Sequence, residues 1–275
     1  MSTPGRPERG LPAGQAPSGD AQAPGARIMT GRRNLYGYDI GILMIEASFP
    51  RPPGAVGNAL SFDFPVLHHV VPGATSDATV HALGALEPGS APYRAALAPW
   101  LDGARALERQ GVRAITSSCG FTALIQEELA QAVSVPVFAS SLLMVPMIAR
   151  MLPPAARVGV VTASLASLSE RHLRAAGIDP ARVALAGLDD CPLFQDMTYR
   201  NRHEVDFAVV EAEVCAAVHG LLAGRPEVRA LMLECSLLPP YAAAIQRRTG
   251  LPVFDYATFV NHVHAALNRT PYASP

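Results

Sequence analysis

The chain uses one structural unit twice, and this repeat constrains its fold more than any other feature of the sequence. Residues 112–119, which read Val-Arg-Ala, four residues and Cys, recur as residues 228–235. Seventeen residues after each cysteine comes Pro-Val-Phe, beginning at Pro136 and again at Pro252. Matching positions, such as 119 and 235, lie 116 residues apart without a gap. An internal repeat indicates one supersecondary unit used twice, and each copy here carries a cysteine.

Apolar runs and amphipathic segments alternate through both halves of the chain. Continuous apolar runs predict buried strands at 39–45, 66–71, 112–117, 136–138, 157–162, 182–188 and 228–233. Capping, proline and glycine signals predict helices at 93–110, after Cys119, and at 141–151, 167–176, 204–223 and 239–250. This alternation is typical of parallel sheets and of an α/β fold. We therefore predict two pseudo-symmetric lobes, each a small doubly wound parallel sheet flanked by helices.

The composition changes sharply near residue 34. Residues 1–33 are rich in Pro, Gly, Ala and Ser and contain almost no large apolar side chains, so we predict a disordered tail. A transit peptide or propeptide is the alternative. We assign 34–140 to the first lobe, completed by 252–275, and 141–251 to the second. The segment 46–65 is a long loop with several Pro and Gly residues, and loops of this kind in compact domains usually cover or bind ligands.

Charge and cysteine content argue against several classes of protein. The 22 basic and 23 acidic residues nearly balance, whereas nucleic-acid-binding surfaces need a basic excess. Four cysteines without a Cys-x-x-Cys pattern predict reduced thiols in a cytoplasmic protein. No apolar run reaches the roughly 20 residues that span a bilayer, and no metal-ligand spacing accompanies the cysteines. We expect a small-molecule carboxylate as the partner, no nucleic acid, no membrane and no metal, and leave a homodimer open.

Cys119 and Cys235 each stand at the end of a predicted strand, directly before a predicted helix. Ligands of open parallel sheets bind beyond these strand ends, where unpaired amides and the helix dipole lower a thiol pKa from about 8.5. The two turns also offer four backbone amides to a substrate carboxylate, those of Gly120, Phe121, Ser236 and Leu237. If the lobes face each other, one thiol acts as general base and the other as general acid on opposite faces of a carbon.

The alternative role for a free cysteine is that of a small buried hydrophobe. We assign this role to Cys215, which lies in an apolar helical segment, and to Cys191, which precedes a proline in a loop. The matching positions of Cys119 and Cys235 favour catalysis for that pair. A disulfide between them would be unusual in the cytosol.

The chain resembles the aspartate/glutamate racemase superfamily, which also includes hydantoin racemases, arylmalonate decarboxylases and maleate isomerases. The resemblance covers about residues 38–266 and lies in the segments 41–44, 116–121, 136–138, 158–162, 234–236 and 252–255. It implies two pseudo-symmetric lobes with the active site between them, no pyridoxal phosphate or other cofactor, and Cys119 and Cys235 as the paired acid and base. The decarboxylases of this superfamily retain only the second cysteine, so two cysteines favour racemisation or isomerisation.

The chain departs from glutamate racemases next to both cysteines. Gly120-Phe121-Thr122 stands where those enzymes have Asn-Thr, and Glu234-Cys235-Ser236-Leu237 where they have Gly-Cys-Thr-Glu or Gly-Cys-Thr-His. These changes indicate a less polar substrate than glutamate. The remaining candidates for substrate binding are Glu46 and Ser48 after the first strand, Thr162 and Ser164 at the symmetric position, Asn58 on the long loop, and Ser118.

Three functional hypotheses follow. The first is a cofactor-independent racemase or epimerase of an amino acid or related α-carboxylate, in which one thiolate removes the α-proton and the other thiol protonates the opposite face. The second is decarboxylation or cis–trans isomerisation of a small dicarboxylate on the same scaffold, with a covalent cysteine adduct in the case of isomerisation. The third is a non-catalytic small-molecule binding protein in which the thiols are incidental.

Overall fold

The apolar strand β1 (Ile40–Met44) lies in the middle of the first sheet. Alternate side chains, from Ile40, Ile42 and Met44, enter one core cluster, while Leu43 enters the other, so both faces of the strand are covered. β1 pairs in parallel with β2 (Val66–Val70) and β3 (Ala114–Ser117), and β3 pairs with β4 (Val137–Phe138). The strand order is therefore β2-β1-β3-β4.

The second sheet repeats this topology. It contains β5 (Arg157–Thr162), β6 (Val183–Gly187), β7 (Val228–Leu233) and β8 (Val253–Asp255), all parallel, in the order β6-β5-β7-β8. The two copies of the sequence repeat are thus β3 with β4 and β7 with β8, at equivalent places in the two sheets. The predicted α/β fold with two lobes is confirmed.

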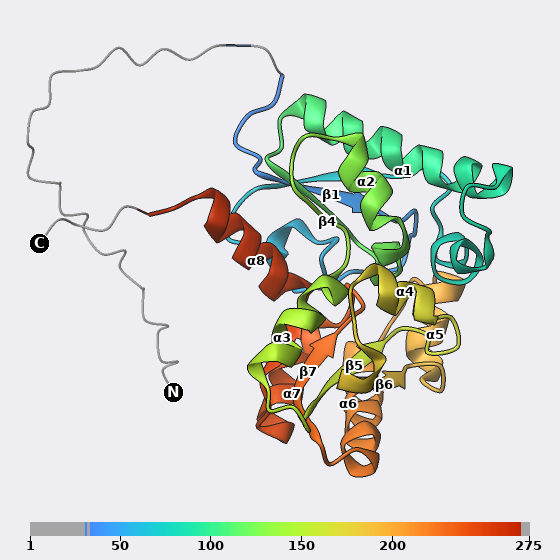
Figure 1. The fold of residues 1–275 in the computed structure, drawn as a ribbon, viewed down its shortest axis with the longest axis vertical. Coiled ribbons are helices and arrows are strands. Elements are labelled where there is room, and N and C mark those ends of the chain that lie inside the picture. Colours follow the sequence, from blue (N-terminus) through green and yellow to red (C-terminus); the bar gives the residue numbers. More distant parts are fainter. Residues whose placement is uncertain (1–30, 32–33, 271–275) are drawn as a thin grey trace, which may run out of the picture. The chain divides into compact units, whose positions relative to one another are not determined.

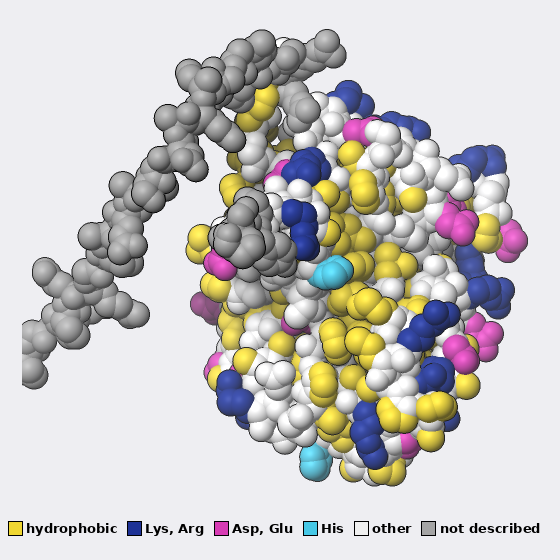
Figure 2. Space-filling view, turned by 60° about the vertical axis from the view of Figure 1, so that its left-hand side comes forward, with side chains coloured by type: hydrophobic (Ala, Val, Ile, Leu, Met, Phe, Trp, Pro, Cys, Tyr) yellow, Lys and Arg dark blue, Asp and Glu magenta, His cyan; other side chains and the backbone are white. Residues whose placement is uncertain are grey.

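This description comes from a computed structural model and covers residue 31 and residues 34–270. Residues 34–270 all belong to one compact unit. The tail predicted to be disordered, 1–33, lies outside the described residues except for Gly31. On the face shown in Figure 2, basic and acidic side chains are interspersed among hydrophobic ones, as the nearly balanced charge predicts.

Eight α-helices flank the two sheets within the described residues (Figure 1): α1 (Ala91–Gln110), α2 (Gln126–Ala132), α3 (Val145–Met151), α4 (Glu170–Ala175), α5 (Pro192–Arg200), α6 (Phe207–Gly224), α7 (Ala242–Thr249) and α8 (Tyr256–Leu267). Shorter turns complete the fold: the π-helix η2 (Asp77–Ala82) and the 3-10 helices η1 (Ala59–Ser61), η3 (Leu83–Ala85), η4 (Gly120–Ile125), η5 (Ser141–Met144), η6 (Pro180–Arg182) and η7 (Pro239–Tyr241). α1 ends as predicted at Gly111, which is left-handed at φ 90°.

Two predictions about helices were wrong. α4 begins after Ser169 rather than Ser167, because Ser169 forms the capping box with His172, while the Ser167 hydroxyl instead contacts His81 at 2.7 Å. The predicted helix 204–223 is α6, but the separate α5 that precedes it was not predicted. The α5 segment is short and mixed in polarity, and it is held by the burial of Phe194 and Met197.

Two helices exchange between the lobes. α3 follows β4 of the first sheet but packs against β5 of the second. α8 follows β8 of the second sheet but packs on the first, where Tyr256 and Val260 join the cluster of Ile40. Because β8 pairs with β7, the chain returns to the first lobe after Asp255 rather than at residue 252.

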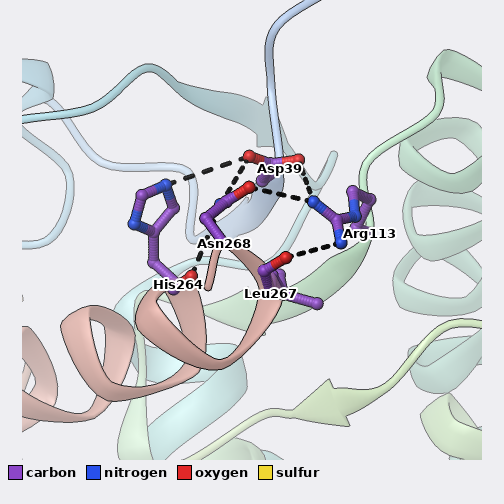
Figure 3. A network of polar contacts seen from close by, with 5 residues as sticks. All are labelled: Asp39, Arg113, His264, Leu267 and Asn268. Carbon is purple, nitrogen blue, oxygen red and sulfur yellow. Dashed lines mark hydrogen bonds and ion pairs between the residues drawn. The ribbon is translucent and has the colours of Figure 1, made fainter. Parts of the chain in front are cut away.

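A polar cluster fixes the end of α8 to the first lobe (Figure 3). Arg113 donates to Asp39 at 3.2 Å, to the Asn268 side-chain oxygen at 3.0 Å and to the Leu267 carbonyl at 2.7 Å. The Asn268 amide donates to Asp39 at 2.8 Å, and His264 lies 3.9 Å from the same carboxylate. These contacts join the start of β1 and the start of β3 to the last turn of the chain's last helix.

Among the described residues, α6 is the one helix that is long and apolar enough to cross a membrane by length and composition alone. In this fold it packs against β6, α5 and α7, and it buries Val210, Val214 and Val218 in the core of the second lobe.

Candidate active site

The two repeated cysteines occupy equivalent turns. Cys119 follows β3 with an extended backbone and precedes η4, and Cys235 follows β7 after one residue. The amide of Phe121 acts to lower the pKa of the Cys119 thiol, and the amide of Leu237, its counterpart in the repeat, acts in the same way on the Cys235 thiol. The helix after Cys119 begins as a 3-10 turn, in which the Thr122 amide donates to the Cys119 carbonyl at 3.2 Å, and the Leu238 amide makes the equivalent bond to the Cys235 carbonyl at 3.0 Å.

A hydrogen bond across the lobes joins the two turns, and further bonds support each turn. The Ser236 hydroxyl donates to the Ser118 carbonyl at 2.5 Å, and the Ser118 hydroxyl accepts from the Ile45 amide at 3.0 Å. The Ser141 hydroxyl donates to the Glu234 carbonyl at 3.1 Å. Ser118 and Ser236 therefore position the cysteine turns and are themselves largely buried.

Both thiols line one small cavity of about 20 Å³, which holds little more than one water molecule. Its lining comes from the long loop after β1, from η2, from both cysteine turns and from α5. The lining residues are Ile45, Phe49, Arg51, Ser76, Val80, Ser118, Cys119, Gly120, Phe121, Ala163, Thr198, Glu234, Cys235, Ser236 and Leu237. A substrate larger than water requires this lining to move.

Glu234 is a fully buried carboxyl directly before Cys235. Its Oε2 accepts from the Thr162 hydroxyl at 2.9 Å and from the Ala163 amide at 3.4 Å, whereas its Oε1 has no hydrogen-bond partner. Burial raises the pKa of this carboxyl to about 7. A side chain at position 120 would overlap Glu234, so the glycine after Cys119 makes room for the carboxyl.

The expected lowering of the thiol pKa is wrong for this closed state. Burial, followed by the charge of Glu234, raises the pKa of Cys119 to about 12, and the same two causes raise the pKa of Cys235. Amide hydrogen bonds act in the opposite direction but are outweighed by burial. Both thiols are therefore protonated at neutral pH unless a ligand changes their surroundings.

Arg51 supplies a positive charge to the same cavity. Its guanidinium lies 4.4 Å above the Phe49 ring, one nitrogen donates to the Ala47 carbonyl at 3.3 Å, and Nη2 is buried without a partner. None of the ion pairs found in the described part of the chain involves Arg51. Burial lowers its pKa, and a buried, unpaired guanidinium is suited to a carboxylate.

Comparison with known proteins assigns the chain to a family. A family model described as Asp/Glu/Hydantoin racemase matches residues 77–261. The chain belongs to the Asp/Glu/hydantoin racemase family.

Solved structures of this family share the fold. Arylmalonate decarboxylase aligns with a TM-score of 0.53 and 18% identity, over 86% of this chain and 95% of that one. Allantoin racemase from Klebsiella pneumoniae aligns with a TM-score of 0.54 and 18% identity, over 83% and 87%. Glutamate racemase from Francisella tularensis aligns with a TM-score of 0.51 and 18% identity, over 86% and 85%.

The curated relatives include lyases. Dimethylsulfoniopropionate lyase 3 from Emiliania huxleyi is 32% identical over 241 residues, which is 84% of this chain and 60% of the relative. Dimethylsulfoniopropionate lyase from Durusdinium sp. clade D is 28% identical over 227 residues, or 81% of this chain and 72% of the relative. The chain therefore spans about 60% of the length of the Emiliania enzyme.

Ten residues were predicted to contact the substrate. Six of them line the cavity of the two cysteines or support its lining. Ser118, Gly120, Phe121, Ser236 and Leu237 are in the lining. Thr162 is fully buried but donates to Glu234, so it orients the carboxyl rather than facing open space.

The other four predicted residues lie elsewhere. Glu46 is exposed and accepts from the Gly73 amide at 2.8 Å, away from both thiols. Ser48 contacts Asn201 and His203 of the second lobe, and Ser164 donates to Asp189 at 2.8 Å. Asn58 caps η1 and donates to the Arg51 carbonyl at 2.8 Å, so it holds the loop that carries Arg51.

Sequence reasoning missed Arg51 and Glu234. Arg51 lies on the loop that was singled out for its length, and a charged residue among its prolines was the available signal. Glu234 directly precedes the repeated cysteine, where a departure from the family pattern was visible. Ser76 and Thr198, whose hydroxyls are buried without partners in the cavity wall, carried no sequence signal. No cluster of His, Cys, Asp or Glu suited to a metal occurs among residues 34–270.

Proposed function

We propose that this protein is a cofactor-independent lyase that removes a proton next to a carboxylate and expels a leaving group from the neighbouring carbon. The proposed substrate is dimethylsulfoniopropionate. The observation that carries the proposal is that two thiols and the unpaired guanidinium of Arg51 face the same small cavity. The similarity to dimethylsulfoniopropionate lyases over most of the chain supports this substrate.

The chemistry needs one base and one anchor. Arg51 binds the carboxylate, and a cysteine thiolate takes a proton from the carbon beside it. The electron pair of that C–H bond forms the carbon–carbon double bond while the carbon–sulfur bond breaks. The products are acrylate and dimethyl sulfide, and the thiol then returns its proton to solvent.

The closed cavity serves this reaction by excluding water from the developing charge. Substrate enters only when the lining moves, and the loop that carries Phe49 and Arg51 contacts the second lobe through Ser48. Closure then brings Arg51 and the thiols together around the substrate. This ordering resembles that of lids which complete a site when they close.

Racemisation of an α-carboxylate is the second candidate. It is favoured by the equivalent positions of Cys119 and Cys235, since a racemase needs a proton donor on each face. Both reactions begin with removal of the same α-proton. They differ in the fate of the carbanion, which loses a leaving group in one case and gains a proton in the other.

Release of dimethyl sulfide into the headspace tests the proposal directly. We expect the wild-type chain to release it from dimethylsulfoniopropionate, and C119A and C235A to lower the rate, with a loss of at least about a hundredfold for the variant lacking the base. C215A is the matched control, because Cys215 lies on α6 outside the cavity lining, and it should keep the wild-type rate.

Two outcomes reject the lyase. Wild-type protein that exchanges the α-proton of amino acids in D₂O without releasing dimethyl sulfide is a racemase. Protein that binds the substrate but shows neither activity is a binding protein. Equal rates in wild type, C119A and C235A would exclude the thiols from the chemistry altogether.

A further inference from the structure

We propose that Glu234 selects the cationic end of the substrate, holding a sulfonium or quaternary ammonium group opposite the carboxylate held by Arg51. This inference rests on the proposed function and extends it to the recognition of the leaving group. It assigns a role in specificity to a residue that directly precedes the second cysteine of the repeat.

The placement of Glu234 is that of a ligand-binding carboxylate. The side chain is fully buried, lines the cavity of the two thiols, and keeps Oε1 without any hydrogen-bond partner. A buried oxygen of this kind costs free energy unless something binds it. Its other oxygen is fixed by Thr162 and Ala163, so the free oxygen has a defined position.

The neighbouring turn is built around this carboxyl. Oε1 lies against Gly120, where any side chain would overlap it, and Gly120 directly follows Cys119. The counterpart of Glu234 in the first copy of the repeat is Ser118, and the counterpart of Gly120 in the second is Ser236. The repeat is therefore broken by one acid and one glycine that fit each other, which places a single negative charge between two otherwise equivalent thiols.

An onium cation matches what surrounds Oε1. A trimethylammonium or dimethylsulfonium group has no N–H or O–H to donate, so it binds through its charge and through aromatic faces. The Phe121 and Phe49 rings line the cavity. The Tyr199 hydroxyl is buried and unpartnered, and its pKa is raised first by burial and then by the charges of both thiols and Glu234. Arg51 and Glu234 together give the cavity one charge of each sign, as a zwitterion requires.

A bound cation also changes the thiols. The negative charge of Glu234 is one cause of the raised pKa of Cys119 and of Cys235. A cation beside Glu234 offsets that charge, so a cationic substrate favours the thiolate that removes its proton. A carboxylate of the same shape in which an uncharged group replaces the cation does not.

The experiment compares two unreactive probes by calorimetry. One is β-trimethylammonio-propionate, and the other is its carbon isostere, in which a tert-butyl group replaces the trimethylammonium. Wild type should bind the cation more tightly than the isostere, and E234Q should lower this preference by roughly thirtyfold or more while leaving the isostere unchanged. E227Q, at a half-buried ion pair with Arg157 in the second lobe, is the control for the same loss of charge and keeps the preference.

A second measurement needs no variant. Because the pKa of Glu234 is about 7, the affinity of wild type for the cationic probe should fall as the pH drops through 7, while the isostere shows no parallel loss. The other groups facing this carboxyl do not titrate there: Cys119, Cys235, Tyr199 and Tyr256 have a raised pKa, and that of His172, beside Phe121, is lowered to about 4. Arg51 stays cationic, and any effect on the shared carboxylate appears with both probes.

Equal preference for the cation in wild type and E234Q, or a pH dependence identical for both probes, overturns this role of Glu234. Neither measurement depends on turnover. If wild type prefers the cationic probe through Glu234 but releases no dimethyl sulfide, the proposed reaction is wrong and the role of Glu234 in recognition stands. If it releases dimethyl sulfide without this preference, the reaction stands and the role of Glu234 is wrong.

Discussion

Replacing Gly120 with alanine tests whether the acid and the glycine between the thiols form one packed unit. The added Cβ would lie within 2.8 Å of Glu234 Cγ and closer still to its carboxyl, far inside ordinary contact. Overpacking of a rigid core costs roughly 1–3 kcal/mol, and moving Glu234 also weakens its charged hydrogen bond with Thr162, worth roughly 1.5–3 kcal/mol. We expect G120A to lose about 3 kcal/mol of unfolding free energy.

The double variant supplies the decisive comparison. In an E234A background the space is empty, so the same Gly120→Ala change should cost less than about 1 kcal/mol, and the two substitutions should be coupled by about 2 kcal/mol or more. Urea denaturation followed by circular dichroism gives the four free energies of the cycle. G220A is the matched control: Gly220 lies inside α6 with nothing near its missing Cβ, so alanine there should stabilise by about 0.5–1 kcal/mol. An equal cost of G120A in both backgrounds would refute the packing argument.

Three further predictions use the same protein. R51Q should raise the KM for dimethylsulfoniopropionate roughly thirtyfold or more, because it removes the proposed carboxylate anchor. R105Q, at an exposed ion pair on α1, is the control and should leave KM unchanged. An unaltered KM in R51Q would refute the role of Arg51 as the anchor. The pKa of Glu234 is raised from 4.5 to about 7 in the folded state, so the folded state binds a proton that the unfolded state has lost in this range. The free energy of unfolding should therefore fall by about 3 kcal/mol as the pH rises from about 4.5 to about 7. Urea denaturation should show this fall in wild type but not in E234Q, and an equal pH dependence in both proteins would contradict the burial of the Glu234 charge. R113A should lower the free energy of unfolding by only about 1 kcal/mol, because the ion pair of Arg113 is partly exposed. It should also speed amide hydrogen exchange in α8. Exchange that accelerates evenly over both lobes would argue against a local role of Arg113 in holding α8.

The sequence predicts the scaffold well because its signals are local. β5 and β7 have the predicted bounds, since each is an apolar run closed by polar residues at both ends. The repeat adds long-range information, because equal spacing around Cys119 and Cys235 can be satisfied only by equivalent strands and turns. The residues that determine these strands are neighbours in the chain or are related by one offset.

The site is less predictable because its contacts join distant segments. Glu234 is fixed by Thr162, which lies 72 positions earlier, and it faces Gly120 in the other lobe. Arg51 reaches the cavity from a loop without periodicity, where a Cβ at Gly57 would come within 2.5 Å of its side chain. Neither arrangement follows from propensity or spacing. Glu46, by contrast, has the right place in sequence but turns outward to the Gly73 amide.

The thiols are equivalent in the repeat but unequal in their surroundings, and this bears on the choice of reaction. Burial raises the pKa of both thiols, but the amides of Phe121 and Thr122 counteract the rise at Cys119, whereas the Leu237 amide alone does so at Cys235, which follows Glu234 directly. Amide donors stabilise a thiolate, so Cys119 is the better base of the two. Elimination needs one base, and solvent can take the proton afterwards, while racemisation needs each thiol to serve in turn. We therefore expect C119A to lose dimethyl sulfide release more completely than C235A. If C235A loses as much dimethyl sulfide release as C119A, or more, Cys119 is not the preferred base. The inequality of the two thiols then no longer favours elimination over racemisation.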